Sequence, residues 1–222
     1  TPSFANDIYI TQSGDGLDLD ITQDGANNII GTSSTDVTLT GDTMTFAITQ
    51  TGSSNTIAAI IKGDTYTGTW QFTGDSNTVD LLCSSSASGN CDTVTLNITT
   101  TGDDNTYDFD IGESADADSS TVSFTVTGDN NIINTDVDGQ STALTVTLDN
   151  NSSLSTNSSN SDEGVTITTT QSGNGDSQGM GITLGVTGGG GTVDITQSGV
   201  NDNIVDLTIA GDDFDVDIIQ RD

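Results

Sequence analysis

The side chains that could do chemistry in this chain are almost all aspartates. Acidic residues number 33 against two basic ones, histidine is absent, and the formal net charge is -31 at pH 7. Without histidine the chain lacks the commonest general base and the commonest transition-metal ligand. Aspartates occur throughout the sequence, so no pair stands out as the two carboxylates with which a glycosidase flanks its substrate. We therefore expect no enzymatic activity.

Calcium is the ligand that the aspartates suit best. Carboxylates on successive stacked strands would lie about 4.8 Å apart, where like charges repel and Ca²⁺, which prefers oxygen ligands, could bridge them. The dense Gly-Gly-x-Gly-x-Asp array of calcium β-rolls is absent, since Gly188–Gly191 is followed by Thr192. A plain acidic surface screened by salt is the alternative. We expect that no cofactor is required and leave bound Ca²⁺ open.

The charge also bears on the partners of the chain. Two basic residues cannot neutralise a phosphate backbone, and a strongly acidic surface is repelled by anionic lipid. No apolar run approaches the roughly 20 residues of a membrane-spanning helix. We expect neither nucleic-acid binding nor membrane insertion.

The two cysteines, Cys83 and Cys91, flank a loop rich in serine and glycine. A disulfide that closes this loop is the natural interpretation for a secreted protein, with two free thiols as the alternative. The first residues agree weakly with secretion, because Ser3-Phe4-Ala5 resembles the small-residue site that a signal peptidase cleaves. We interpret residues 1–7 as an N-terminal segment and a leader stub.

One motif, Ile-Thr-Gln-x-Gly-x-x-Asn-x-Ile, recurs along the chain with substitutions. Gly41, Gly52, Gly63 and Gly74 follow one another in steps of 11 residues, and later intervals are wider. The spacing predicts an all-β fold, a β-solenoid or stacked-sheet array of strand–turn–strand repeats of about 22 residues with loop insertions. The positions expected in an inward ladder and at turns are Gln12, Gly14, Gln23, Gly25, Asn28, Gln50, Gly52, Asn55, Gly74, Asn77, Gly102, Asn105, Gly128, Asn131, Gln171, Gly173, Gln197 and Gly199.

Between these turns the sequence alternates between apolar and polar residues, as in Val94-Thr95-Leu96-Asn97-Ile98. A period of two predicts strands with one buried face and one exposed face. The Gly-x-x-Asn element supplies residues that tolerate left-handed backbone angles at the corners. No segment has helical apolar spacing, so we expect almost no helix. Residues 8–222 then form a single repetitive domain with insertions at 83–91, 112–120 and 150–163.

The recurrent glutamine has two interpretations. It either points inward, where stacked amides bond from rung to rung, or lies in solvent at the end of a strand. Its recurrence favours the ladder, although Phe72, Thr100 and Val126 replace it in the middle of the chain.

Over residues 8–82 and 165–209 the Gln-x-Gly-x-x-Asn spacing resembles the curlin repeats of secreted curli fibres. The resemblance implies a β-solenoid of two-strand rungs, subunits that stack end to end, and secretion. The chain departs from that pattern in its greater acidity, its long insertions and the residues Leu17, Asp176 and Asp202, each three positions after a repeat glycine.

These observations together predict a secreted, extracellular or cell-surface structural subunit of a filament or biofilm matrix. We expect self-assembly into a head-to-tail homopolymer through the terminal strands, Asp7–Gln12 and Phe214–Gln220, because unpaired strand edges are templates for pairing. The alternative is a phage or cell-surface adhesin or fibre module, stabilised by calcium.

Threonine rows raise a further alternative. Ice-binding solenoids carry flat rows of threonine, and Thr95, Thr99, Thr121, Thr125 and Thr127 could form one. Against this, threonine is a common exposed strand residue, and Thr-x-Thr does not recur in each repeat.

Overall fold

The computed structural model describes residues 7–25, 27–31, 37–83, 91–112, 119–137, 141–149, 152–159, 165–174, 180–200 and 203–221. The first six residues, the loop between the cysteines and most of the expected insertion at 112–120 lie outside the described residues.

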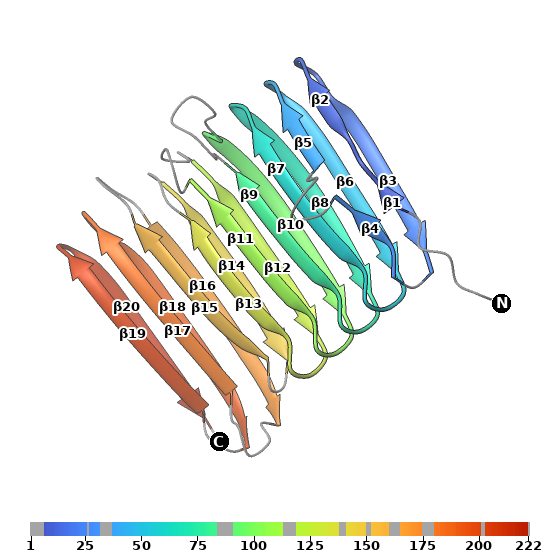
Figure 1. Cartoon of the computed structure of the whole chain (residues 1–222). Helices are drawn as coiled ribbons and strands as arrows, with labels where there is room; N and C mark the ends of the chain where they lie inside the picture. Colours follow the sequence, from blue (N-terminus) through green and yellow to red (C-terminus); the bar gives the residue numbers. More distant parts are fainter. Residues whose placement is uncertain are drawn as a thin grey trace.

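The described residues form two parallel sheets and no helix (Figure 1). Sheet A contains β1 (Asp7–Ile8), β2 (Thr11–Ser13), β4 (Ile29–Ile30), β5 (Val37–Thr40), β7 (Thr56–Lys62), β9 (Thr78–Cys83), β11 (Thr106–Ile111), β13 (Ile132–Val137), β15 (Ser153–Ser159), β17 (Met180–Gly188) and β19 (Asn203–Gly211). Sheet B contains β3 (Asp18–Asp24), β6 (Met44–Thr51), β8 (Thr65–Thr73), β10 (Thr93–Thr101), β12 (Thr121–Thr127), β14 (Ala143–Asp149), β16 (Val165–Asn174), β18 (Gly191–Val200) and β20 (Phe214–Arg221).

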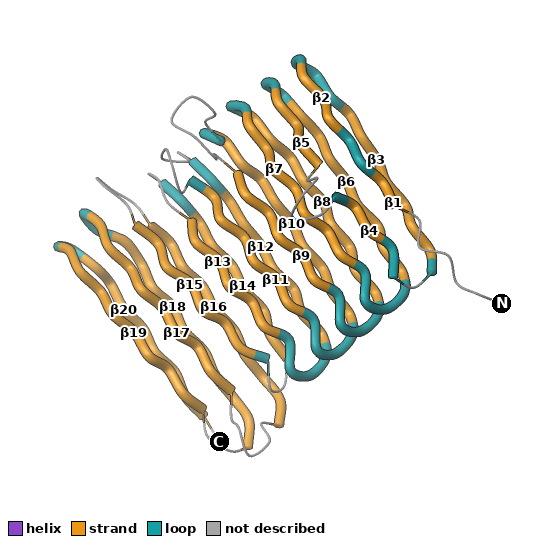
Figure 2. The backbone as a smooth tube through the Cα atoms, viewed as in Figure 1, coloured by secondary structure: helices purple, strands orange, loops and turns teal. Residues whose placement is uncertain are grey.

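The chain alternates between the sheets, so each turn of the coil contributes to both, and the next turn pairs with it in parallel. This arrangement is a β-solenoid, as the repeat predicted. Figure 2 shows the described corners in teal, at the ends of the rungs. The steps of 11 residues between glycines are explained, because Gly41 and Gly63 lie at one corner and Gly52 and Gly74 at the other.

The rungs differ in length but not in register. Equivalent residues are separated by 27, 22, 28 and 26 residues in successive rungs from Asn28 to Asn131. Most of the extra residues lie at corners. In the rung that contains Asn28 they lie between β4 and β5, which both pair with β7. The strands of sheet B stay paired residue for residue, as in Thr67 with Thr95 and Thr95 with Thr121. Insertions therefore leave the stacking of side chains intact.

The core is a narrow layer between the two sheets. The alternating apolar residues point into it, and Leu96, Phe109 and Phe124 are fully buried. The centre of the core is aromatic: the Phe109 ring lies 5.9 Å from Trp70 and 5.0 Å from Phe124, measured between ring centroids. Gly68 makes room in this layer, since a Cβ there would come within 2.6 Å of the Tyr66 hydroxyl.

The expected insertion at 150–163 is wrong over Ser153–Ser159. This segment is β15, which pairs with β13 on one side and β17 on the other. Its composition, SLSTNSS, contains one apolar residue, Leu154, which is 2 % exposed. The backbone pairing on both edges thus holds a strand that side-chain alternation does not reveal.

The corners between sheet B and sheet A have a more specific backbone than expected. The first glycine has a positive φ, 141° at Gly102, and the residue before the asparagine is left-handed, with φ of 62° at Ser54 and 57° at Asp104. The asparagine itself is not the left-handed residue. A Cβ at Gly102 would also meet the carbonyl oxygen of Gly74 at 2.3 Å, so glycine is required there by space as well as by φ.

Candidate functional site

A ladder of asparagines lines these corners. Each backbone N–H donates to the side-chain oxygen of the asparagine one rung further along the chain, with N···O distances of 2.8 to 3.0 Å from Asn28 to Asn131. The ladder ends at Ser152, whose hydroxyl accepts the N–H of Asn131 at 3.2 Å. The members are at most 1 % exposed, so each ladder bond satisfies a buried polar group. Its members are Asn28, Asn55, Asn77, Asn105 and Asn131.

The glutamines of sheet B form a second inward ladder, in two segments. Gln50 donates to Gln23 at 2.7 Å near the N-terminal end. Near the other end Gln197 donates to Gln171 at 3.1 Å and Gln220 donates to Gln197 at 2.9 Å. Four of these glutamines are buried, and they point inward as one of the two interpretations expected: Gln23, Gln50, Gln171 and Gln197.

Between these segments the same column is filled by Phe72, Thr100, Val126 and Leu148. Thr100 shares a hydrogen bond with the Tyr107 hydroxyl, so the buried hydroxyl is satisfied across the core rather than along the column. The sequence motif weakens here because packing and one local hydrogen bond replace the amide bonds.

Gln12 does not belong to this ladder. It lies on β2 in sheet A, opposite Leu39, and its amide donates to the Gly14 carbonyl oxygen. The string Ile-Thr-Gln-x-Gly occurs at both kinds of corner, so the motif alone places Gln12 with the other glutamines. Gly14 accordingly stacks on Gly41, whereas Gly25 belongs to the corner that contains Gly52, and Gly128 stacks on Gly102. Gly173 and Gly199 are paired in sheet B.

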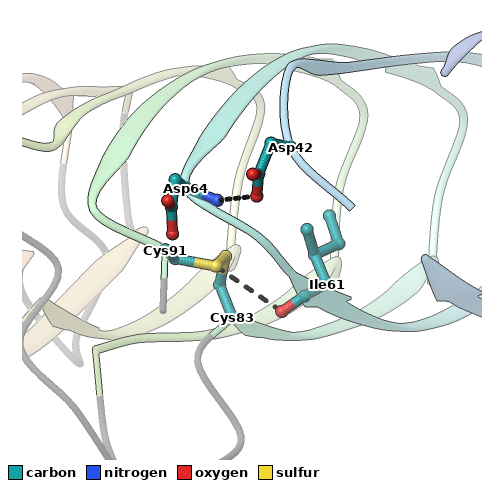
Figure 3. Close-up of a disulfide and its surroundings, with 5 residues drawn as sticks. All are labelled: Asp42, Ile61, Asp64, Cys83 and Cys91. Carbon is teal, nitrogen blue, oxygen red and sulfur yellow. Dashed lines mark hydrogen bonds between the residues drawn. A yellow bond between two sulfur atoms is a disulfide. The ribbon is translucent and has the colours of Figure 1, made fainter. Parts of the chain in front are cut away.

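Cys83 and Cys91 are joined by a disulfide with a Cα–Cα distance of 6.0 Å, and both are fully buried (Figure 3). Cys83 ends β9 in sheet A and Cys91 precedes β10 in sheet B. The bridge therefore ties the two sheets together where the chain passes between them. The Cys91 sulfur lies 3.5 Å from the carbonyl oxygen of Ile61 in the preceding rung.

Aspartates stack outside the corners. The N–H of Asp103 donates to Asp75, at 2.8 Å, and that of Asp129 donates to Asp103, at 2.6 Å. At the opposite corner Asp64 donates to Asp42 at 3.2 Å (Figure 3). Each of these carboxylates thus accepts a backbone hydrogen bond from the next rung. Among the described residues no group of three or more acidic or cysteine side chains is arranged to hold a metal ion.

The N-terminal end of the solenoid leaves its core partly open. Ile8 and Ile10 of the first turn, and Leu17 and Leu19 that follow, are only half-buried. Tyr9 is 52 % exposed. Within the described residues β3 pairs with β6 alone, so β3 forms this edge of sheet B.

The C-terminal end is open in the same way. Val216 and Ile218 on β20 are 40 % and 43 % exposed, although they continue columns that are buried further inside the solenoid. In sheet A, Val205 and Leu207 of β19 are half-buried. Within the described residues β20 pairs with β18 alone and β19 with β17 alone.

The two ends are the candidate functional site. Each presents two strand edges that no other described strand pairs with, and a row of partly exposed apolar side chains. Together these features favour the addition of further strands. The ladders do not form a catalytic centre, because they consist of amides that bond to one another and to the backbone.

The part of the chain that the structure describes contains no helix long and apolar enough to cross a membrane. Comparisons of the chain with protein-family models, curated proteins and solved structures returned no match.

Proposed function

We propose that this protein is a structural subunit of an extracellular filament, and that subunits stack head to tail through their terminal rungs. The observation that carries the proposal is that the last rung presents the same columns, in the same order, as the first rung. The buried disulfide supports an oxidising, extracellular setting.

In sheet B the registers define how the two ends would meet. Following the pairs from β3 to β20 places Gln220 in the column of Gln23, and Ile218 in the column of Ile21. A second copy that continues the coil would therefore pair its β3 with β20, and its Gln23 would extend the amide ladder from Gln220. Val216 would then pack against Leu19 of that copy.

In sheet A the same continuation pairs β19 with β1 and β2 of the next copy. Val205 falls in the column of Ile8, and Leu207 in the column of Ile10. All four residues are half-buried in the isolated chain. Both sheets would gain a strand at once, which converts two open core ends into an ordinary internal rung.

Charges on the outer face would set the conditions for this contact. Arg221, one of the two basic residues, would lie opposite Asp24 of the next copy and attract it. Asp217 would lie opposite Asp20 and repel it, as like charges on neighbouring strands do. We therefore expect assembly to be favoured by salt, which screens exposed charges.

Such a contact uses different surfaces on the two partners and does not close on itself, so it generates a filament rather than a dimer. The test is polymerisation of the full chain in salt, followed by negative-stain microscopy and sedimentation velocity. We expect filaments from the wild-type protein and monomers from Ile218→Lys, which places a charge on the exposed end of the core. The matched control is Thr183→Lys on the exposed outer face of β17, which should polymerise like the wild type.

A charge exchange tests the register itself. Arg221→Asp should slow assembly, and a mixture with Asp24→Arg subunits should restore it, because the pair is re-formed with reversed signs. Circular dichroism must show that each variant is folded. A wild-type protein that stays monomeric at high concentration in salt contradicts the proposal, and so does unchanged polymerisation of folded Ile218→Lys.

A further inference from the structure

The middle of the outer face of sheet B, from β6 to β16, is rich in threonine. We call the outward-pointing residues of strands β6 to β16 the threonine plane, because threonine occupies most of its positions. One column of the plane contains Thr45, Thr67, Thr95 and Thr121, which are paired directly from strand to strand. All four are exposed or half-exposed.

A second column lies four residues further along each strand. It contains Thr99, Thr125, Thr147 and Thr170, again in direct register. Further threonines at Thr69, Thr73 and Thr101 lie in the columns beside these. The repeats differ in length, so this alignment depends on the registers rather than on a constant sequence interval.

Charge is nearly excluded from the threonine plane. Asp149, at the C-terminal end of β14, is the one acid among its described residues, in a chain of net charge -31. The flanking strands β3, β18 and β20 of the same sheet carry outward aspartates. The opposite outer face, on sheet A, carries Asp80, Asp108, Asp110 and Asp136. The two faces share one backbone geometry and differ in their side chains, so strand propensity alone does not account for the difference.

The geometry of the plane is regular in two directions. Outward residues repeat at about 6.6 Å along a parallel strand and at about 4.8 Å between strands. The strands run in nearly the same direction from the first rung to the last (Figure 1). β-Branching restricts the side-chain rotamers of threonine, so each residue presents a methyl and a hydroxyl group in a fixed arrangement.

We propose that the threonine plane binds ice. The plane repeats in two directions, as the surface of a crystal does, so its hydroxyl groups can hold an ordered array of waters that joins the ice. Water-mediated hydrogen bonds are enthalpically nearly as good as direct ones, and the methyl groups gain by leaving liquid water. A neutral lattice also suits an uncharged face better than the carboxylates found elsewhere.

Other ligands fit the plane less well. Its described outward residues include no aromatic side chain to stack on a sugar and no basic side chain to hold a phosphate. The plane lies on the flank of the solenoid, so the proposal is independent of contacts between the ends and holds for a monomer or a filament.

The test is thermal hysteresis and ice-affinity partitioning of the full chain. We expect a freezing point below the melting point, faceted ice crystals, and enrichment of the protein in slowly grown ice. Thr125→Tyr, at the centre of the plane, should remove most of the hysteresis because the ring lifts the face off the lattice. Thr183→Tyr, on the exposed outer face of β17, is the matched control and should keep full activity.

Thermal melting followed by circular dichroism must show that the variants are folded, and Thr99→Tyr replaces Thr125→Tyr if the latter is not. Absence of both hysteresis and partitioning in the wild-type protein overturns the proposal. Full activity of a folded plane variant, or equal loss in the Thr183→Tyr control, also overturns it.

Discussion

Replacement of Phe109 by alanine probes the core where the two sheets meet. The Phe109 ring is fully buried and lies between Trp70 at 5.9 Å, Tyr107 at 6.4 Å and Phe124 at 5.0 Å. Phe→Ala changes in cores cost about 3–5 kcal/mol, and aromatic pairs add about 0.5–1.5 kcal/mol beyond their buried area. Because three rings lose a partner at once, we expect a value near 5 kcal/mol. At about 3 °C per kcal/mol for a chain of this size, Tm falls by roughly 15 °C.

The assay is urea denaturation and thermal melting, each followed by circular dichroism, with Asp108→Ala as the control. Asp108 is the exposed neighbour of Phe109 and lies opposite Asp80, so its removal should change stability by less than about 0.5 kcal/mol or raise it slightly. A lower m-value in Phe109→Ala would mean that its rungs unfold separately, as repeat proteins can. A cost below about 1 kcal/mol with an unchanged m-value would refute a close-packed aromatic core at this position.

Two further predictions concern the disulfide and the buried tyrosines. Replacing Cys83 and Cys91 by serine should lower the free energy of unfolding by about 2.5 kcal/mol, the loop-closure entropy of a bridge with a sequence separation of 8. Thiol titration of the denatured, unreduced protein checks the bridge first. Two free thiols would show that the bridge does not form. Burial raises the pKa of Tyr66, against an opposing hydrogen bond from Trp70, so above the ordinary tyrosine pKa of about 10 the unfolded state loses a proton that the folded state keeps. The free energy of unfolding should therefore fall as pH rises above about 10, and it should fall less steeply in Tyr66→Phe. Urea midpoints measured at rising pH test this. The same dependence on pH in both proteins would contradict the burial of this hydroxyl.

Much of the fold could be predicted from the sequence, because apolar residues alternate with the two-residue period of a strand and the turn motif recurs along the chain. Alternation places Leu96 and Phe109 inside, and the repeat spacing yields a coil of two-strand rungs. The disulfide pairing was also accessible, since two cysteines allow only one intramolecular bridge. The position of Gln12 was not, because the same short string precedes both kinds of corner.

Other features depend on contacts between rungs and leave little trace in one sequence. Strand β15 is held by backbone pairing on both edges despite its serine and asparagine content. Gly68 has no turn to form, and its role appears only when Tyr66 and Leu96 are seen around it. The alignment of the threonine plane is visible only from the register of every strand, because equivalent residues are separated by intervals that vary from 22 to 28 residues.

The stacking of equivalent residues in columns has a consequence for how such a chain can change in length. Each rung contacts its two neighbours through columns that are the same kind of surface on either side, and the ladder bonds repeat from one rung to the next. Deletion or duplication of one whole rung would therefore rejoin matching columns, whereas loss of a single residue inside a strand would turn the rest of that strand to the wrong face. The solenoid can thus be shortened or extended in whole rungs, with its cross-section unchanged.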